Sequence, residues 1–177
     1  MILSELKFIV TGTPGVGKST AMSTISDIGP VVTDEVVIDG LTALQEASTV
    51  AFDVGELLLD NETIVRIYGT PGQERFRNRW EKLAQDALGL IILLDDTRTD
   101  PVYDLGIYIE NFSELIHQTS VVVGVTKIDD SDVAALDKYC DWLTLRNIYC
   151  PVIAVDPRRE RDMAALMEAL ISMLEFA

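Results

Sequence analysis

Short apolar runs of strand length alternate with helical patterns along the chain. Four such runs stand out, at 6–12, 88–96, 120–127 and 150–156. Three of them are almost continuously hydrophobic, and such strands need cover on both faces, which is typical of a parallel sheet between layers of helices. Helical patterns follow the runs at 18–28, 103–117, 131–145 and 160–176. This alternation predicts an α/β fold.

One hairpin interrupts the alternation. The segments TVAFDVGELLL (49–59) and TIVRIYG (63–69) flank a polar Asp-Asn-Glu turn, after a predicted loop at about 30–48. Two apolar segments joined in this way indicate antiparallel strands. We therefore expect a six-stranded, mostly parallel sheet with one antiparallel edge strand and helices on both faces, in a single domain over residues 1–177.

Four isolated residues add detail to this scheme. Ser131 is a good N-cap for the helix at 131–145. His117 lies near the expected end of a helix, where a cation is favourable. Cys140 and Cys150 have no second cysteine pair or nearby histidine for a zinc site, so we expect them to be buried, reduced thiols.

The net charge of −15 narrows the range of partners. Nucleic acids and anionic lipid surfaces attract basic proteins, so this charge argues against nucleic acid as a partner and against direct docking on such membranes. No apolar stretch is long enough to span a bilayer, and neither terminus shows a signal peptide or a lipidation motif. We expect a cytoplasmic protein without a membrane anchor.

The segment from Gly12 to Ser19, GTPGVGKS, matches the phosphate-loop pattern G-x-x-x-x-G-K-[ST] between a predicted strand and a predicted helix. Glycines allow backbone N–H groups to curl around phosphate oxygens, and the helix N-terminus adds partial positive charge. Lys18 can reach the β- and γ-phosphates, and the Ser19 hydroxyl can bind Mg²⁺. The predicted nucleotide contacts are Gly12, Thr13, Pro14, Gly15, Val16, Gly17, Lys18, Ser19 and Thr20.

The segment Thr126-Lys127-Ile128-Asp129 follows the run at 120–127 and resembles the guanine-specifying N/T-K-x-D signature of GTPases. The Asp129 carboxylate can accept hydrogen bonds from guanine N1–H and from its exocyclic amine, whereas adenine offers no such pair of donors. Lys127 can lay its stem along the base and brace the phosphate loop. Thr126, Lys127 and Asp129 are therefore predicted nucleotide contacts.

With both motifs present, the whole chain resembles the Ras-like small GTPases. The segments STVAFDVGELLL, IYGTPGQERF, GLIILLDDTR and VTKIDD are similar to the prokaryotic MglA-like group, especially the branch found beside roadblock-domain proteins in bacterial signalling operons. The resemblance implies a Ras-like P-loop NTPase fold that binds GTP or GDP with Mg²⁺. It also implies a roadblock/LC7-type partner, an effector that reads the switches, and a bacterial role in motility, polarity or signalling.

The resemblance assigns residues in the first switch and in the last loop. Thr49 fits the threonine that binds Mg²⁺ and senses the γ-phosphate, with alternatives at Ser48, Thr42 and Thr33. In the loop after the last strand, family members contact guanine through a backbone N–H, a role that could fall here to Val155 or Asp156. The alternative is that Asp156 only caps the final helix.

The second switch departs from the family pattern. In place of D-x-x-G-Q-E, the chain reads Gly-Thr-Pro-Gly-Gln-Glu over 69–74, so Gly69 replaces the aspartate on the metal side. Gly72 can still contact the γ-phosphate through its N–H, and Gln73 can still orient the attacking water. We expect Gln73, Lys18 and Thr49 to carry catalysis.

Asp53 is the candidate to replace the missing carboxylate. A two-residue turn would pair Leu59 with Glu62 and bring Asp53 opposite Tyr68, one residue from Gly69. We expect Asp53 to reach Mg²⁺ through a bridging water. The alternative is a solvent-facing aspartate on an edge strand, since a register slip of one residue would turn its side chain to the other face.

No arginine lies between the phosphate loop and Arg66, so the first switch has no arginine finger. Intrinsic turnover should therefore be slow, on the order of 10⁻⁴ s⁻¹, as for Ras without an activating partner. One alternative function is a GTP-binding scaffold that does not hydrolyse, which Gly69 and Pro14 favour and Gln73 opposes. Another is a P-loop metabolite kinase, which the segment 126–129 and the short chain oppose.

Overall fold

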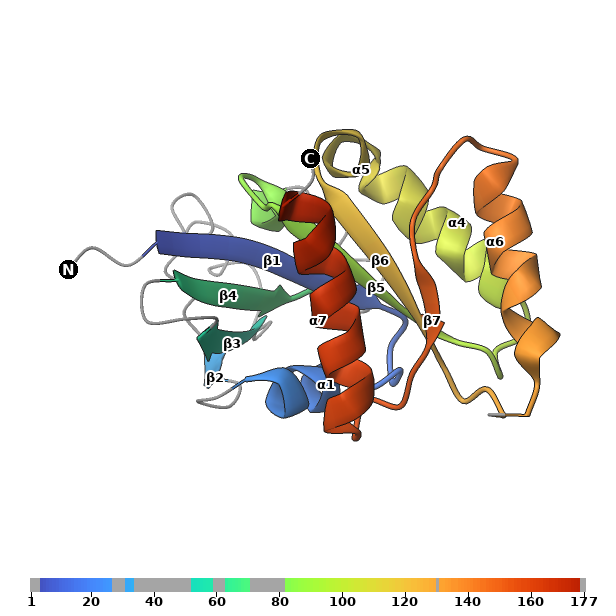
Figure 1. Cartoon of the computed structure of the whole chain (residues 1–177), viewed down its shortest axis with the longest axis horizontal. Coiled ribbons are helices and arrows are strands. Elements are labelled where there is room, and N and C mark those ends of the chain that lie inside the picture. Colours follow the sequence, from blue (N-terminus) through green and yellow to red (C-terminus); the bar gives the residue numbers. More distant parts are fainter. Residues whose placement is uncertain are drawn as a thin grey trace.

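A computed structural model of the chain describes residues 4–26, 31–33, 52–58, 63–70, 82–129 and 131–175. Within these ranges, seven strands form one sheet in the order β2-β3-β4-β1-β5-β6-β7 (Figure 1). The strands are β1 (Ser4–Gly12), β2 (Val31–Thr33), β3 (Phe52–Leu58), β4 (Thr63–Gly69), β5 (Gly89–Asp95), β6 (Ser120–Thr126) and β7 (Val152–Ala154).

The pairing of the strands confirms a mostly parallel sheet. β3 runs antiparallel to both of its neighbours, β2 and β4, and the remaining ladders are parallel. The predicted count of six strands is one short, because β2 lies in the interval that was expected to be a loop. A three-residue strand is too short to give a periodic signal. As a result, the antiparallel strand β3 is next to the edge of the described sheet.

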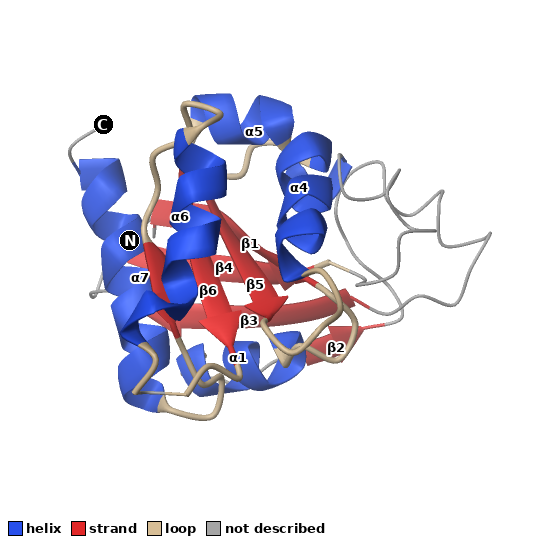
Figure 2. Ribbon diagram, turned by 90° about the vertical axis from the view of Figure 1, so that its right-hand side faces the viewer, coloured by secondary structure: helices blue, strands red, loops and turns tan. Residues whose placement is uncertain are grey.

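The helices are α1 (Lys18–Ile25), α4 (Pro101–Asn111), α5 (Ser113–Gln118), α6 (Asp137–Thr144) and α7 (Glu160–Glu175), with a 3₁₀ helix, η2 (Val133–Leu136), before α6. Figures 1 and 2 show α1 and α7 on one face of the sheet and α4, α5 and α6 on the other. The core divides in the same way: in β1, Ile9 packs in the cluster of Tyr108, and Phe8 packs in the cluster of Met22 and Leu166. Successive side chains of a strand alternate in this manner.

The hairpin register differs from the prediction by one residue. Asp53 pairs with Gly69 rather than with Tyr68, and Leu58 pairs with Ile64. An odd number of residues, 59–63, separates that last pair, which a two-residue turn does not allow. The predicted register assumed that Asp60-Asn61 forms a two-residue turn. The corrected register brings the backbone of Asp53 directly beside Gly69.

Three local corrections concern helix starts and cysteines. α4 begins at Pro101, because the Asp100 carboxylate accepts the Tyr103 N–H at 3.0 Å as an N-cap. Ser131 does not cap a helix; its N–H and Oγ both donate to Asp129. Cys140 is exposed, because α6 turns Tyr139 and Leu143 to the core instead.

Two further sequence expectations concern the end of α5 and the cysteine pair. His117 lies in the last turn of α5, as expected. Cys150 is partly buried, and both cysteines are free thiols. Within the described ranges, no helix is long and apolar enough to cross a membrane.

Candidate functional site

The connection from β1 to α1 forms a glycine-dependent loop at the carboxyl end of the sheet. Gly12, Gly15 and Gly17 all have positive φ, of 155°, 76° and 106°. A Cβ at Gly12 would overlap the Leu93 carbonyl oxygen, whereas a Cβ at Gly15 would project into open space. Glycine at 12 therefore permits a close approach to β5, and glycine at 15 leaves the main chain open to a ligand.

The polar groups of this loop include an ammonium and a buried hydroxyl. Lys18 Nζ donates to the carbonyl oxygens of Gly12 at 2.8 Å and Thr13 at 3.1 Å, so the ammonium lies across the loop. The Thr13 hydroxyl is buried without a hydrogen-bond partner. The N-cap of α1, Gly17, makes no side-chain capping bond, and the first turn holds no acidic residue. These features suit an anionic group such as phosphate.

Ser19 and Thr20 follow Lys18 in the first turn of α1, and both are exposed. Pro14 is exposed as well and has no N–H to offer. Val16 is buried and packs in the core beneath the loop. The predicted phosphate-loop residues are therefore brought together, with Val16 anchoring the loop.

A pocket of about 570 Å³ extends from this loop. Its wall combines three segments that are distant in sequence: the phosphate loop and α1, the end of β6, and the loop from β7 to α7. The lining residues are Val16, Gly17, Thr20, Thr126, Lys127, Ile128, Asp129, Ala154, Val155, Asp156, Pro157, Arg158, Arg159 and Asp162. The structure thus brings the two predicted motifs to a single pocket, as expected for the carboxyl ends of parallel strands.

Asp129 is exposed at the pocket wall and ready to accept hydrogen bonds. The Ser131 N–H at 3.0 Å and Oγ at 2.8 Å both donate to Asp129 Oδ1. These two bonds hold the pKa of the Asp129 carboxyl below its usual value, so it is ionised at neutral pH. Thr126, by contrast, is buried and donates its hydroxyl to the Leu94 carbonyl at 3.1 Å. Thr126 therefore supports the turn, and Asp129 presents the charge.

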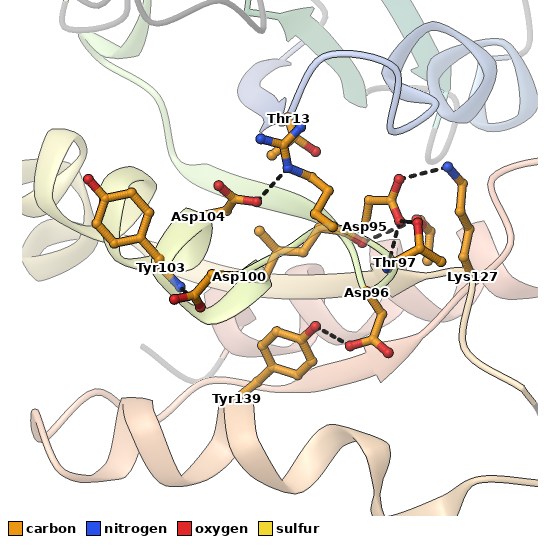
Figure 3. A network of polar contacts seen from close by, with 12 residues as sticks. Thr13, Asp95, Asp96, Thr97, Asp100, Tyr103, Asp104, Lys127 and Tyr139 are labelled. Atoms are coloured by element: carbon orange, nitrogen blue, oxygen red, sulfur yellow. Dashed lines mark hydrogen bonds and ion pairs between the residues drawn. The ribbon is translucent and has the colours of Figure 1, made fainter.

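Lys127 differs from its predicted role. Its Nζ contacts Asp95 Oδ2 at 2.7 Å rather than bracing the phosphate loop, and its backbone is left-handed, with φ of 61°. Asp95 also accepts the Thr97 N–H at 2.9 Å and the Thr97 hydroxyl at 2.6 Å (Figure 3). Burial alone would raise the pKa of Asp95, but the bonds from Lys127 and Thr97 outweigh it and lower that pKa. Asp95 thus fixes Lys127 at the pocket.

A second carboxylate, Asp96, ties the same loop to α6. Tyr139 donates its hydroxyl to Asp96 Oδ1 at 2.5 Å (Figure 3). Lys138 Nζ lies 2.7 Å from the same oxygen. Burial, with the bond to Asp96 next, raises the pKa of Tyr139, so the phenol stays protonated and donates. The loop after β5 is therefore bonded to Lys127 through Asp95 and to α6 through Asp96.

The loop after β7 does not offer the backbone donors expected of it. The Val155 N–H donates to the Val125 carbonyl at 2.9 Å, and the Asp156 N–H donates to Asp162 Oδ2 at 2.9 Å. The Asp156 carbonyl accepts the Arg159 N–H at 2.9 Å. Asp156 therefore closes a turn just before α7, which begins at Glu160, and both Val155 and Asp156 still line the pocket.

Sequence reasoning missed Pro157. A Cβ at Gly17 would lie 3.0 Å from Pro157 Cγ, and the Thr24 hydroxyl donates to the Pro157 carbonyl at 2.6 Å. Pro157 therefore couples the phosphate loop to the loop after β7. These partners are far apart in sequence, so no local pattern signals the contact. Asp95 could have been noticed, because it is a carboxylate at the end of a fully buried strand.

Several predicted residues lie outside the described ranges: Thr49, Gly72, Gln73, and the alternatives Ser48 and Thr42. The alternative Thr33 lies in β2 and pairs with Phe52. Asp53 is described by its pairing with Gly69. Within the described ranges, no group of three or more His, Cys, Asp or Glu residues could hold a metal ion.

Comparison with solved structures identifies the fold. The G domain of the T. maritima FeoB iron transporter superimposes with a TM-score of 0.66 over 96% of this chain and 99% of that domain, at 17% identity. The chain has the fold of a GTPase G domain. The bacterial selenocysteine-specific elongation factor EF-Sec (TM-score 0.68, 16% identity) and SelB from Methanococcus maripaludis (0.71, 13%) agree, although the chain covers only 29% and 35% of their lengths.

The sequence relatives are too distant, or cover too little of the chain, to show which family it belongs to. No family model matches the chain. The uncharacterized protein MJ1339 of Methanocaldococcus jannaschii is 26% identical over 142 residues, which is 77% of this chain and 80% of that protein. Rab-18-B of Danio rerio is 30% identical over 101 residues, 56% of this chain and 44% of that protein. The G-domain fold is confirmed, and the narrower MglA-like assignment remains a proposal.

Proposed function

We propose that the chain is a small GTPase switch: a single G domain over residues 1–177 that binds GTP or GDP with Mg²⁺. The observation that carries this proposal is that Gly17 of the phosphate loop and Asp129 line one pocket. A phosphate site at one end and a carboxylate at the other match the two ends of a guanine nucleotide. SelB, part of which has this fold, was solved in complex with the GTP analogue GppNHp, which supports a guanine nucleotide as the ligand here.

The residues around the phosphate loop fit the triphosphate and the metal. The open main chain at Gly15, the unpartnered Thr13 hydroxyl and the Lys18 ammonium suit phosphate oxygens. Ser19 and Thr49 would hold Mg²⁺ through their hydroxyls, and the ion would neutralise charge on the phosphates. Lys18 would leave its carbonyl partners for the phosphates, an exchange of neutral acceptors for charged ones.

Asp53 would reach the metal through a bridging water. This proposal rests on the corrected register, which pairs its backbone with Gly69, the position where the family pattern has aspartate. Asp53→Ala should then weaken Mg²⁺-dependent GDP binding about tenfold, since each metal-site partner of this kind is worth 10–100-fold. Asp53→Ala affinity that equals the parent's at every Mg²⁺ concentration would rule out this role.

Hydrolysis would use Gln73, which orients water for attack on the γ-phosphate, while the Gly72 N–H contacts that phosphate. We propose slow intrinsic turnover, because the sequence supplies no arginine in the first switch. The switch surface around 72–80 would be read by an effector when GTP is bound. A roadblock/LC7-type protein would stimulate turnover, and the cytoplasm of a bacterium, in motility, polarity or signalling, would be its setting.

The second candidate is a GTP-binding scaffold that does not hydrolyse. Two departures favour it: Gly69 ends β4 where a carboxylate is usual, and Pro14 stiffens the phosphate loop. GTP turnover, measured with and without a roadblock partner, separates the two candidates. Turnover that rises with the partner supports the switch, and no turnover in either case supports the scaffold.

The nucleotide assignment is tested by changing Asp129 to Asn. An amide presents a donor where guanine also presents donors, so Asp129→Asn should lower the affinity for GDP about 100-fold. The same variant should raise the affinity for xanthosine diphosphate, whose C2 carbonyl accepts a hydrogen bond. Asp132→Asn is the matched control, because Asp132 is exposed on the same turn and does not line the pocket. An Asp129→Asn protein that keeps the parent's preference would refute the assignment.

A further inference from the structure

The pocket leaves one guanine atom without an assigned partner. If Asp129 accepts the N1–H and the exocyclic amine, as the proposed function holds, the C6 carbonyl oxygen still needs a donor. An acceptor taken into a pocket without a donor loses affinity, because its hydrogen bond to water is not replaced. The donor has to come from the walls of this pocket.

The backbone from Val155 to Arg159 does not supply it. The Val155 N–H and the Asp156 N–H donate to Val125 and to Asp162. Pro157 has no N–H, since its nitrogen is part of the ring.

The next two amides are engaged as well. The Arg158 N–H donates to Asp156 Oδ1 at 2.9 Å, and the Arg159 N–H donates to the Asp156 carbonyl at 2.9 Å. Each backbone donor of this five-residue stretch is therefore absent or bound within the protein.

The Arg158 side chain, in contrast, has donors in excess and a fixed orientation. Its Nε donates to Asp156 Oδ1 at 3.0 Å, and one terminal nitrogen donates to Asp156 Oδ2 at 2.7 Å. A guanidinium carries five N–H donors, and this side-on pair uses two of them. The end-on edge, with hydrogens on both terminal nitrogens, can still donate to a ligand. Both residues line the pocket.

We propose that Arg158, oriented by Asp156, donates to the C6 carbonyl of the bound guanine and so determines base specificity together with Asp129. The two groups form a complementary pair: a carboxylate that accepts and a guanidinium that donates. Adenine presents an acceptor at N1 and a donor at C6, so it is mismatched against both. This inference rests on the proposed guanine site and adds a second residue that reads the base.

The exposure of Arg158 limits the size of the effect. Its side chain is 80% exposed at the rim, so water competes for the same hydrogen bond. A bond to a charged donor is worth more than a neutral one, and after screening by water we expect about a tenfold effect on affinity.

The experiment compares dissociation constants of GDP and 6-thio-GDP for the parent, for Arg158→Ala and for Arg161→Ala. Sulfur at C6 is a poor acceptor, whereas the phosphates, N1–H and amine of 6-thio-GDP are unchanged. Arg161→Ala removes the same charge from a side chain that is 87% exposed and does not line the pocket. We expect Arg158→Ala to weaken the binding of GDP about tenfold and the binding of 6-thio-GDP less than twofold. Arg161→Ala should change neither dissociation constant.

Equal losses for both nucleotides would overturn the inference, because they would show a general effect of charge or folding. GDP affinity unchanged in Arg158→Ala would overturn it as well, as would a selective loss in Arg159→Ala instead. In these cases a parent that prefers GDP over ADP leaves the proposed function standing. A parent without that preference would remove the guanine site itself, and this inference with it.

Discussion

Adding a methyl group at Gly55 tests how β3 packs against α1, the helix that follows the phosphate loop. Gly55 lies in the middle of β3, and a Cβ built there would overlap the hydroxyl oxygen of Ser26, just beyond the last turn of α1. The same Cβ would lie 3.5 Å from Ser26 Cβ and 3.8 Å from Met22 Cε, which are ordinary contacts. Only the Ser26 oxygen therefore opposes a side chain at position 55.

The expected magnitudes follow from two opposing effects. Alanine in a strand interior is more favourable than glycine by about 0.5–1 kcal/mol, because glycine loses more backbone entropy on folding. Overpacking costs about 1–3 kcal/mol. Gly55→Ala should therefore lower the free energy of unfolding by about 1 kcal/mol. The Ser26 hydroxyl is buried without a partner, so Ser26→Ala should be neutral or stabilising by up to about 1 kcal/mol.

The assay is urea unfolding of the parent, the two single variants and the double variant. In the Ser26→Ala background the obstructing oxygen is gone, so Gly55→Ala should become neutral or stabilising, which gives a coupling energy of about 1–2 kcal/mol. Unchanged m-values across the four proteins are the control that unfolding remains comparable. The reasoning is refuted if Gly55→Ala destabilises both backgrounds equally, within about 0.5 kcal/mol.

Three further predictions concern the site. Gly17→Ala should weaken GDP binding at least about tenfold and destabilise the fold by about 1–3 kcal/mol, because φ is 106° and Pro157 Cγ is 3.0 Å from the added Cβ. Calorimetry measures the affinity and urea unfolding measures the stability, and a variant equal to the parent in both would contradict the geometry. Asp95→Asn removes a carboxylate whose pKa burial alone would raise, but which the bonds from Lys127 and Thr97 together lower in the fold. The parent should therefore be more stable than Asp95→Asn at pH 7, and the difference should shrink as pH falls below about 4, the unfolded pKa; a difference that stays constant down to pH 2 would count against the pair. Gln73→Leu should lower GTP turnover at least about tenfold and leave GDP affinity unchanged, as single-turnover assays and titrations would show, and full turnover would exclude Gln73 as the residue that orients water.

The sequence predicted those parts of the fold whose signal is local. β5 and β6 are buried along their whole length, and their continuous apolar runs gave both position and parallel pairing. The phosphate loop was predicted because its glycines adopt positive φ values, which other residues adopt poorly. Asp129 was found by its spacing from Lys127 after a strand.

Contacts that depend on distant residues were not predictable in the same way. The partner of Lys127 is Asp95, on a neighbouring strand, and nothing near Lys127 in sequence names it. The contact between Pro157 and Gly17 arises only when α7 packs beside α1. The hairpin register failed because turn length, which fixes register, was inferred from two polar residues.

The most direct test of the central claim is the affinity of the parent protein for GDP and for ADP, measured by competition against a fluorescent guanine nucleotide in the presence of Mg²⁺. The account predicts that GDP competes at least about 100-fold better than ADP, because the ionised Asp129 can accept from the N1–H and the amine of guanine, whereas adenine lacks this pair of donors. Equal competition by the two nucleotides, or by neither, would contradict a guanine-specific pocket and leave only the G-domain fold.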